Sequence, residues 1–385
     1  MFTDNFSLKG FIKKKKSKKI QKFLKELIHS DDQVIRSLTN NYNYSYSKKF
    51  IKKLKKFKYI RVFGMGGSSL GANAIYDFLR DRVRNNFFFI SNLNSKKFFA
   101  KKKYLNLIIS KSGNTLETIV NSNVYNNKND KNILITENKK SILRNISYKL
   151  KDDIIDHNNF IGGRYSVLSE VGMLPAELMG LKESKFKRFN HLIKNKYFFN
   201  SIISNVVNIV ELVNRKKLNS VILNYDETAD NFLKWYQQLV AESLGKKGYG
   251  VFPIISTMPK DNHSLMQLYL DGPKNNFFTF FSTKEKFTSK INSKRISNEI
   301  DFLRKKNLND VLSSQISATQ KVFKKKNLPF RSFMIKTRSE EAIGELFCFF
   351  IIETILIAKA LNINPFNQPA VELIKKETKN ILVRT

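Results

Sequence analysis

The sequence predicts an α/β protein made of two consecutive units, each a mostly parallel sheet flanked by helices in three layers. Three observations predict this class. Short apolar runs of strand length alternate with longer helical patterns, which is the order that builds parallel sheets. A Gly-rich turn and a Ser/Thr-rich turn each separate an expected strand from an expected helix. The length of 385 residues accommodates two such units.

Residues 1–55 are predicted to be a helical lead-in, because apolar residues such as Ile20, Leu24 and Leu27 recur at helical spacing. The first unit follows, with expected strands at Tyr59–Phe63, Phe87–Ile90, Leu105–Ile109 and Ile133–Thr136. Its expected helices are Leu70–Arg82 and Leu116–Tyr125. The polar stretch Asp152–Asn159 is interpreted as a linker.

The second unit repeats the alternation. Its expected strands are Ser220–Asn224, Phe278–Phe281 and Ser332–Lys336, and its expected helices are Thr228–Leu244 and Ser339–Leu361. We place the units at residues 56–195 and 196–361, followed by a C-terminal segment, 362–385. The most apolar run, Leu346–Ile352, is too short to cross a bilayer and predicts a buried helix, so no membrane association is expected.

The charge balance is extreme, with 69 Lys and Arg against 32 Asp and Glu, which leaves a net charge of +37. Nucleic-acid binding is one interpretation, because lysines and arginines neutralise phosphates. We favour a solvated surface set by composition, because lysine runs such as Lys48–Lys58 and Lys321–Lys326 are spread along the chain among Asn and Phe. No specific nucleic-acid partner is therefore expected.

Cysteine and histidine are scarce. A single cysteine, Cys348, excludes an intrachain disulfide and suits a reducing compartment. One cysteine and four dispersed histidines cannot supply the usual zinc ligand spacings, so no metal is expected. The N-terminus carries no apolar stretch of secretory type, and we expect a cytoplasmic protein.

Two turns carry candidate chemistry. In Gly64–Ser69, glycines allow the backbone to approach a ligand, and free N–H groups at a helix start attract an anion; the alternative is a tight turn with nothing bound. In Ser110–Thr115, three hydroxyls and Lys111 stand at a second helix start. Helix capping accounts for one hydroxyl, and three favour a phosphate cradle.

Six motifs in order resemble those of the glucose-6-phosphate isomerase family, whose members contain sugar-isomerase (SIS) domains. They are Gly64–Gly71, Ser110–Thr118, Gly162–Ser166, Glu242–Lys246, His263–Gln267 and Asn364–Lys375. The resemblance implies two SIS domains and a homodimer with active sites at the subunit interface. It also implies interconversion of glucose 6-phosphate and fructose 6-phosphate through an enediolate, with no cofactor.

The resemblance also implies roles for individual residues. Glu242 matches the base that moves a proton between C2 and C1, and Arg164 matches the cation that faces the enediolate. His263 and Lys375 match the ring-opening residues, with His263 reaching the site of the neighbouring subunit. The positions that match substrate contacts are Gly67, Ser68, Ser110, Lys111, Ser112, Thr115, Gln238 and Gln368.

Two alternatives stay open at this stage. The same site could isomerise another sugar phosphate, such as mannose 6-phosphate. A protein of a different class, a non-catalytic sugar-phosphate regulator or a nucleic-acid-associated SIS protein, would need the phosphate cradles. Such a protein has no use for Glu242, His263, Arg164 and Lys375 together, and this combination favours an enzyme.

Overall fold

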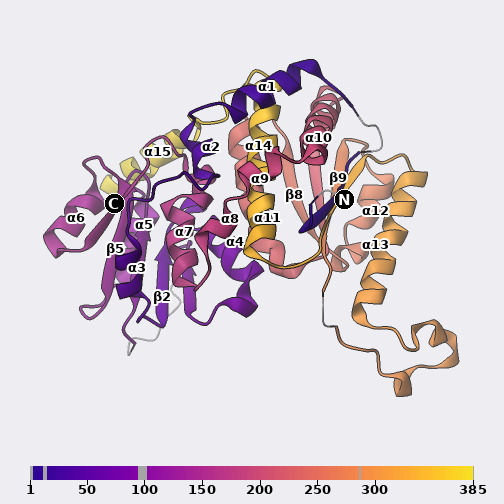
Figure 1. The fold of residues 1–385 in the computed structure, drawn as a ribbon, viewed down its shortest axis with the longest axis horizontal. Coiled ribbons are helices and arrows are strands. Elements are labelled where there is room, and N and C mark those ends of the chain that lie inside the picture. The colour runs from indigo at the N-terminus through magenta and orange to yellow at the C-terminus, as the bar shows by residue number, and fades with distance from the viewer. Residues whose placement is uncertain (1–2, 12–14, 94–101, 286–287, 385) are drawn as a thin grey trace.

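The chain folds into two units that lie side by side, each built on a five-stranded sheet (Figure 1). The computed structural model describes residues 3–11, 15–93, 102–285 and 288–384. Helices cover both faces of each sheet, which confirms the predicted α/β class with three layers. The exact limits of the two domains stay a prediction, although one helix begins at Lys196, where the second unit was expected to start.

The first sheet has the strand order β3-β2-β4-β5-β6, and all its neighbouring strands are parallel. The strands are β2 (Tyr59–Phe63), β3 (Asn86–Ile90), β4 (Leu105–Ile109), β5 (Lys131–Glu137) and β6 (Asp153–His157). The four predicted strands are confirmed. The linker interpretation of Asp152–Asn159 is wrong, because β6 pairs with β5 at the edge of the sheet.

Side chains on the two faces of this sheet enter different clusters, as the alternation along a strand requires. Val62 belongs to the main core, whereas the adjacent Phe63 packs with residues of α5 and α6. The helices of this unit are α3 (Lys48–Leu54), α4 (Leu70–Phe78), α5 (Leu116–Tyr125), α6 (Ile142–Leu150) and α7 (Glu170–Leu178).

The second sheet has the order β1-β10-β9-β7-β8 and is parallel except for β1, which pairs antiparallel with β10. The strands are β1 (Phe6–Lys9), β7 (Asn219–Asn224), β8 (Phe252–Thr257), β9 (Asn276–Thr283) and β10 (Phe330–Ile335). Strand β1 lies inside the predicted helical lead-in, residues 1–55, and was not predicted; it belongs to the second sheet. Strand β8 was not predicted.

Most of the remaining helices connect or cover the two sheets. They are α1 (Lys18–Ile28), α2 (Gln33–Ser37), α8 (Glu183–Phe186), α9 (Phe189–Ile193), α10 (Lys196–Asn214), α11 (Asp230–Leu244), α12 (Met266–Asp271), α13 (Leu308–Lys325), α14 (Glu340–Ala360) and α15 (Val371–Arg384). Within the described ranges, no helix is both long and apolar enough to cross a membrane.

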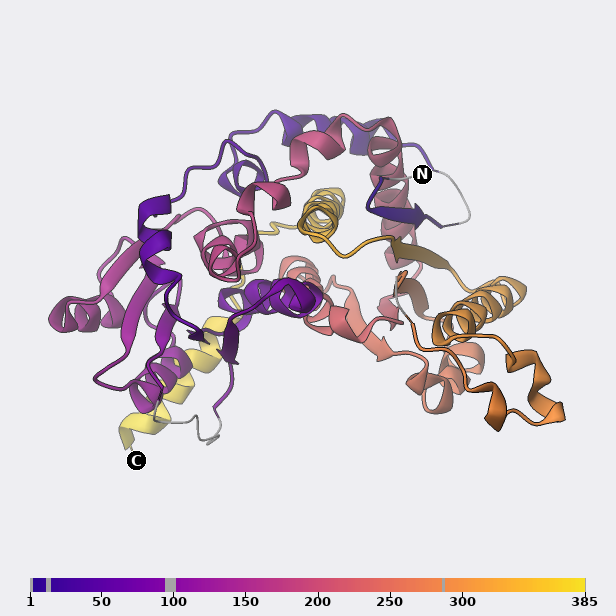
Figure 2. The ribbon, with the colours of Figure 1, turned by 60° about the horizontal axis from the view of Figure 1, so that its bottom comes forward.

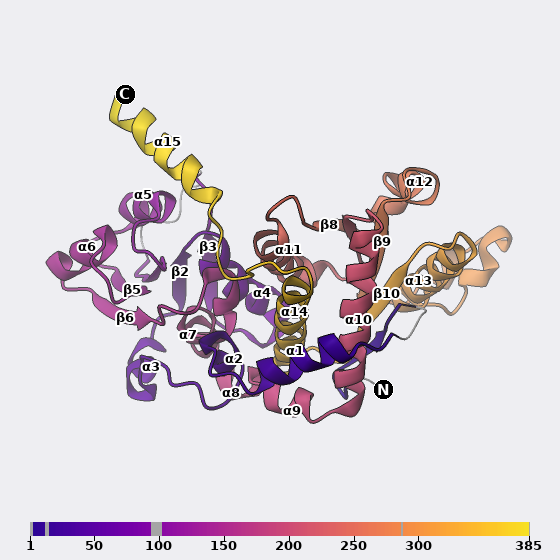
Figure 3. The ribbon, with the colours of Figure 1, turned by 90° about the horizontal axis from the view of Figure 1, so that it is seen from above.

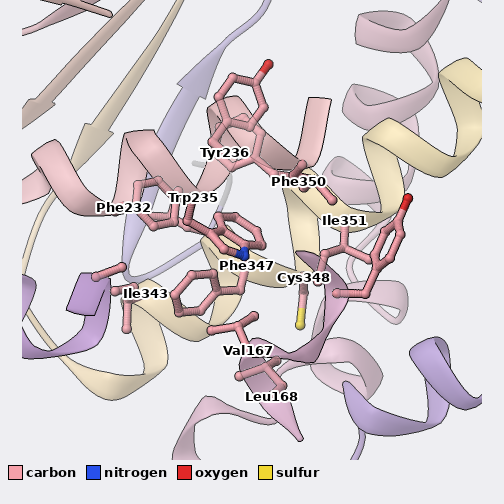
Figure 4. Packing of buried hydrophobic residues seen from close by; sticks show 14 of the residues in the cluster. Val167, Leu168, Phe232, Trp235, Tyr236, Ile343, Phe347, Cys348, Phe350 and Ile351 are labelled. Carbon is pink, nitrogen blue, oxygen red and sulfur yellow. The ribbon is translucent and has the colours of Figure 1, made fainter. Parts of the chain in front are cut away.

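Helices α11 and α14 form the seam between the units, and α11 also packs against α4 of the first unit. The predicted buried helix is confirmed, because α14 contains all of Leu346–Ile352 and is buried along most of its length. Figure 4 shows the aromatic packing at this seam. Phe347 meets Trp235 edge to face, with ring centres 4.6 Å apart, and Phe232 at 5.4 Å.

Two segments extend away from this body. Residues 288–307, which precede α13, form an arm beside the second sheet, seen in orange in Figure 2, on which Phe302 is 71% exposed. Helix α15 projects from the opposite end in Figure 3 and buries none of its residues. It nevertheless carries large apolar side chains in water, including Leu373 and Ile374.

The seam makes a stability prediction. Replacing Phe347 with Ala removes a ring enclosed by Trp235 and Phe232, and we expect the free energy of unfolding to fall by about 3–5 kcal/mol. Phe160→Ala is the matched control, because Phe160 is 80% exposed, and it should change the value by no more than about 0.5 kcal/mol. Urea denaturation followed by tryptophan fluorescence measures both, and equal losses would contradict the assignment of the seam.

Candidate active site

A buried guanidinium lies at the centre of the candidate site. Arg164 follows Gly162 and Gly163 in a 3-10 turn, and its side chain is 1% exposed. Its Nη1 donates to the Glu242 carboxylate and to the Gln368 side chain, both at 2.9 Å, and its Nε donates to Ser243 Oγ at 2.9 Å. Its Nη2 donates to the carbonyls of Pro365 and Asn367. All five guanidinium donors are therefore used.

The Glu242 carboxylate is held from two sides. It lies in the last turn and a half of α11, where Arg164 donates to one oxygen, and Gln238 Nε2, one turn earlier, donates to the other at 2.8 Å. The side chain is 30% exposed, so the carboxylate is fixed in direction and still reaches solvent. A carboxylate held this way can take a proton from a molecule bound above it.

Lys246 ties this helix to the C-terminal segment. Its Nζ donates to Ser243 O at 3.2 Å and to Asn364 O at 2.6 Å. Burial and the nearby Arg164 cation lower the pKa of Lys246 to about 8, against the opposite effect of Glu242. Lys246 and Arg164 therefore hold the same segment, residues 364–368, against the end of α11.

The Gly-rich turn touches this cluster through its backbone. Gly66 has a φ of +52°, and a Cβ there would lie 2.7 Å from Gln238 Nε2. A Cβ at Gly67 would lie 2.2 Å from the carbonyl of Gly163, so the two Gly turns are in contact. Ser68 follows, half-buried, at the end of this turn. Glycine is favoured at Gly66 by its positive φ and is required at Gly67, because a side chain there would push the turn away from the Gly163–Arg164 backbone.

The Ser/Thr-rich turn lies at the same edge of the first sheet, because it follows β4, the parallel neighbour of β2. Ser110 Oγ and Thr115 Oγ1 are 2.9 Å apart, and Lys111 pairs with Glu137 at 3.2 Å. Ser112 is exposed and accepts from the backbone of Asn114. Thr115 occupies the N-cap position of α5 without capping it, so capping does not account for its hydroxyl.

The structure does not bring two of the predicted site residues to this cluster. His263 ends a 3-10 turn shortly after β8 and is exposed. Lys375 lies on α15, where its Nζ pairs with Glu372 at 2.6 Å, and both side chains are more than 60% exposed. Among the contacts of the described residues, neither reaches Glu242 of its own chain.

Three further residues belong to the cluster and were not predicted. Ser243 accepts from Arg164 and lies 2.8 Å from the Tyr165 hydroxyl, which also donates to Pro365 O at 3.2 Å. Trp235 Nε1 donates to Arg164 O at 3.2 Å and so connects the seam to the site. Tyr165 and Ser243 stand inside the quoted motifs, next to Arg164 and Glu242, and that adjacency was the available signal.

Comparison with known proteins identifies the family. Residues 32–251, more than half of the chain, match the family model for phosphoglucose isomerase. The chain belongs to this family. The glucose-6-phosphate isomerase of Methanocaldococcus jannaschii is 33% identical over 349 residues, 84% of each chain. The glucose-6-phosphate isomerase of Campylobacter jejuni is 31% identical, covering 87% of this chain and 88% of the relative.

Solved structures share the fold. A hypothetical protein of Thermus thermophilus superposes with a TM-score of 0.80 at 20% identity and covers 94% of both chains. The glucose-6-phosphate isomerase of Chlamydia trachomatis superposes with a TM-score of 0.74 at 17% identity, covering 99% of this chain and 89% of the other. The fold that the family resemblance implied for this chain is therefore confirmed.

The lowered pKa of Lys246 predicts a dependence of stability on pH. The folded chain holds this proton less tightly than the unfolded chain, so it binds fewer protons between about pH 8 and the ordinary lysine value of 10.5. Through that window the free energy of unfolding gains a contribution that rises with pH. Lys246→Met should remove this rise.

The measurement is urea denaturation at pH 7.5, 8.5 and 9.5. Lys234→Met is the matched control, because Lys234 lies exposed on α11, the helix that ends just before Lys246, and it should keep the wild-type rise. A Lys246→Met protein with the full wild-type pH dependence would contradict the assignment.

Proposed function

We propose that this chain interconverts glucose 6-phosphate and fructose 6-phosphate, with Glu242 as the base. Membership of the phosphoglucose isomerase family supports the reaction. The single observation that carries the assignment of the base is the Glu242 carboxylate, fixed by Arg164 and Gln238 and still open to solvent. The regulator alternative is not favoured, because a protein that only binds the sugar needs no carboxylate held in this way.

The substrate phosphate is assigned to the edge of the first sheet where β2 and β4 end. Ser68, Ser110, Ser112 and Thr115 offer hydroxyls there, and Lys111 offers a nearby positive charge. The first N–H groups of α5 are not capped by Thr115, and uncapped N–H groups at a helix start favour an anion. A phosphate bound at this edge leaves the sugar carbons to extend toward α11.

The proton transfer follows from the position of Glu242. Once the ring is open, Glu242 removes the proton from C2 and returns it to C1, so the base is regenerated within one turnover. Gln238 and Gln368 are assigned to the sugar hydroxyls, and Gly67 to the close approach of the backbone. The same steps apply to mannose 6-phosphate, which differs at C2, and an assay with both epimers defines the selectivity.

Arg164 balances charge in both states of the reaction. Before proton transfer the negative charge is on Glu242, and after it the charge is on the enediolate oxygens. The guanidinium lies beside the carboxylate and is fixed by four other acceptors, so it needs little movement to face either anion. Such preorganised charge lowers the barrier because no dipoles reorient during the reaction.

A homodimer completes the site in this proposal. His263 and Lys375 match the ring-opening residues of the family, and neither contacts Glu242 of its own chain. His263 is assigned to the site of the partner subunit. The arm and α15 expose apolar side chains to water in a single chain. A second copy of the chain would cover these side chains in a dimer.

The first test replaces the base. Glu242→Gln keeps a side chain of the same shape but cannot take a proton, and kcat should fall by about 100-fold or more. Binding of fructose 6-phosphate, measured by calorimetry, should change by no more than about threefold, because the phosphate contacts are intact. Glu227→Gln, an exposed carboxylate just before the same helix, is the control and should keep full activity. A Glu242→Gln enzyme with wild-type kcat would exclude this residue as the base.

The second test is complementation between inactive subunits. Glu242→Gln and His263→Gln chains are mixed in equal amounts, unfolded and refolded together. About a quarter of wild-type activity should return, since half of the dimers are mixed and each mixed dimer has one intact site. Each variant refolded alone is the control and stays inactive. No recovery in a mixture that forms mixed dimers would show that His263 does not serve the partner's site.

A further inference from the structure

Six lysines gather at the edge of the first sheet opposite the candidate active site. They are Lys53, Lys56, Lys58, Lys102, Lys103 and Lys128, here called the amino-edge lysines. They come from the segments that lead into β2, β4 and β5. Because these strands are parallel, the segments that precede them meet at one edge, and the catalytic turns lie at the other. In the sequence these lysines lie in segments that are far apart, and only the fold brings them together.

The surface between the amino-edge lysines is hollow. Two adjoining cavities, of about 560 and 470 Å³, share the lining residues Lys56, Phe57 and Lys103. Lys53 and Lys128 line the larger cavity, and Lys58 and Lys102 line the smaller. The two cavities are open to solvent and adjoin one another, so together they form a concave path lined by lysines at both ends.

A buried ion pair holds this edge in place. The Asp130 carboxylate is fully buried and accepts from Arg61 at 3.1 Å, from the Tyr104 N–H at 3.0 Å and from the Asn127 N–H at 3.0 Å. The Arg61 guanidinium also lies 3.7 Å from the centre of the Tyr104 ring. The turns that carry Lys103 and Lys128 are thereby fixed to the strand that follows Lys58.

The positive charge of this surface is not neutralised within the chain. Of the two acidic residues that line the cavities, Asp130 is engaged by Arg61, and Asp153 pairs with Lys131 at 2.8 Å. Within the described residues, no ion pair involves any of the amino-edge lysines. Six like charges close together repel one another, and an anion that spans them relieves that repulsion.

We propose that the amino-edge lysines bind an extended phosphate polyanion through its backbone, as offered by single-stranded RNA or inorganic polyphosphate. A chain fits the concave path, whereas a flat bilayer would contact only its rim. Base recognition is not expected. The Tyr59 ring is covered by Lys102, whose Nζ lies 4.1 Å from the ring centre, and the Phe57 ring is buried. Neither ring therefore offers a free face on which a base could stack.

The two edges of the sheet separate this site from the sugar site. The five-residue strands β2 and β4 span about 16 Å, so a phosphate chain at one edge leaves the other open. A sugar phosphate should therefore not compete with the polyanion, and isomerisation should proceed while it is bound.

The experiment compares two variants of the full-length chain that lose the same charge. The first carries Lys56→Gln, Lys103→Gln and Lys128→Gln. The control carries Lys321→Gln, Lys324→Gln and Lys325→Gln at the exposed end of α13. Binding of a labelled 20-nucleotide oligouridine is measured by fluorescence anisotropy between 50 and 200 mM salt, and inorganic polyphosphate is added as a competitor. Unfolding midpoints and isomerase activity show whether each variant is folded.

The first variant should bind oligouridine at least about tenfold more weakly. The slope of log affinity against log salt concentration should become shallower by about 2, because each of the three lost phosphate contacts contributes about 0.7. The control should keep the wild-type slope. Binding of both probes supports recognition through phosphates, and binding of one identifies the source as nucleic acid or polyphosphate. Equal weakening in both variants, or no binding of either probe by the wild-type chain near 150 mM salt, would overturn the proposal.

Discussion

The site depends on the burial of one positive charge. Removing a guanidinium from water costs several kcal/mol, and that cost is offset only where every donor finds an acceptor and an anion lies beside it. Arg164 meets both conditions with a carboxylate from α11, a hydroxyl from the same helix and two carbonyls near residue 366. Three segments far apart in the sequence must therefore arrive together. The packing of α11 on α14 places one of them, and Trp235 links that packing directly to the Arg164 backbone.

Strands were predicted correctly from the sequence where both of their faces are buried. Central strands such as Leu105–Ile109 are buried on both faces and consist mostly of apolar residues, so they were predicted correctly. The strands that were missed, β1, β6 and β8, all lie at sheet edges. Edge strands are half exposed, and in β8 a proline follows the first residue and two polar residues end the strand, so a clear strand signal is missing. The four residues of β1 are defined by a partner near the other end of the chain, which no local pattern reveals.

The prediction of the site had a different limit. Motifs located Glu242, Arg164, Gln238 and Gln368, and the structure brings these four together. Sequence could not show that Arg164 uses backbone carbonyls or that Lys246 holds Asn364, because a carbonyl carries no signature in the side-chain sequence. His263 is predicted to act in the site of a second subunit, so the fold of one chain does not bring it to Glu242. Lys375 lies on α15, which is exposed along its length. The gathering of lysines at the opposite edge depended on topology, since only parallel strands bring those segments to one place.

The pairing of β1 with β10 has a consequence for the order in which the molecule forms. The Asn5 side chain donates to the buried Glu345, 340 residues later, and Phe6 faces Ile335 across the strands. On the ribosome, β1 emerges long before its partner β10 is synthesised. Contacts so distant along the chain close slowly. Until they close, β10 is an open sheet edge able to pair with another molecule. The earlier strand of this pair thus seals the second sheet, and the nascent chain is most exposed to misassembly between the synthesis of β10 and its pairing with β1.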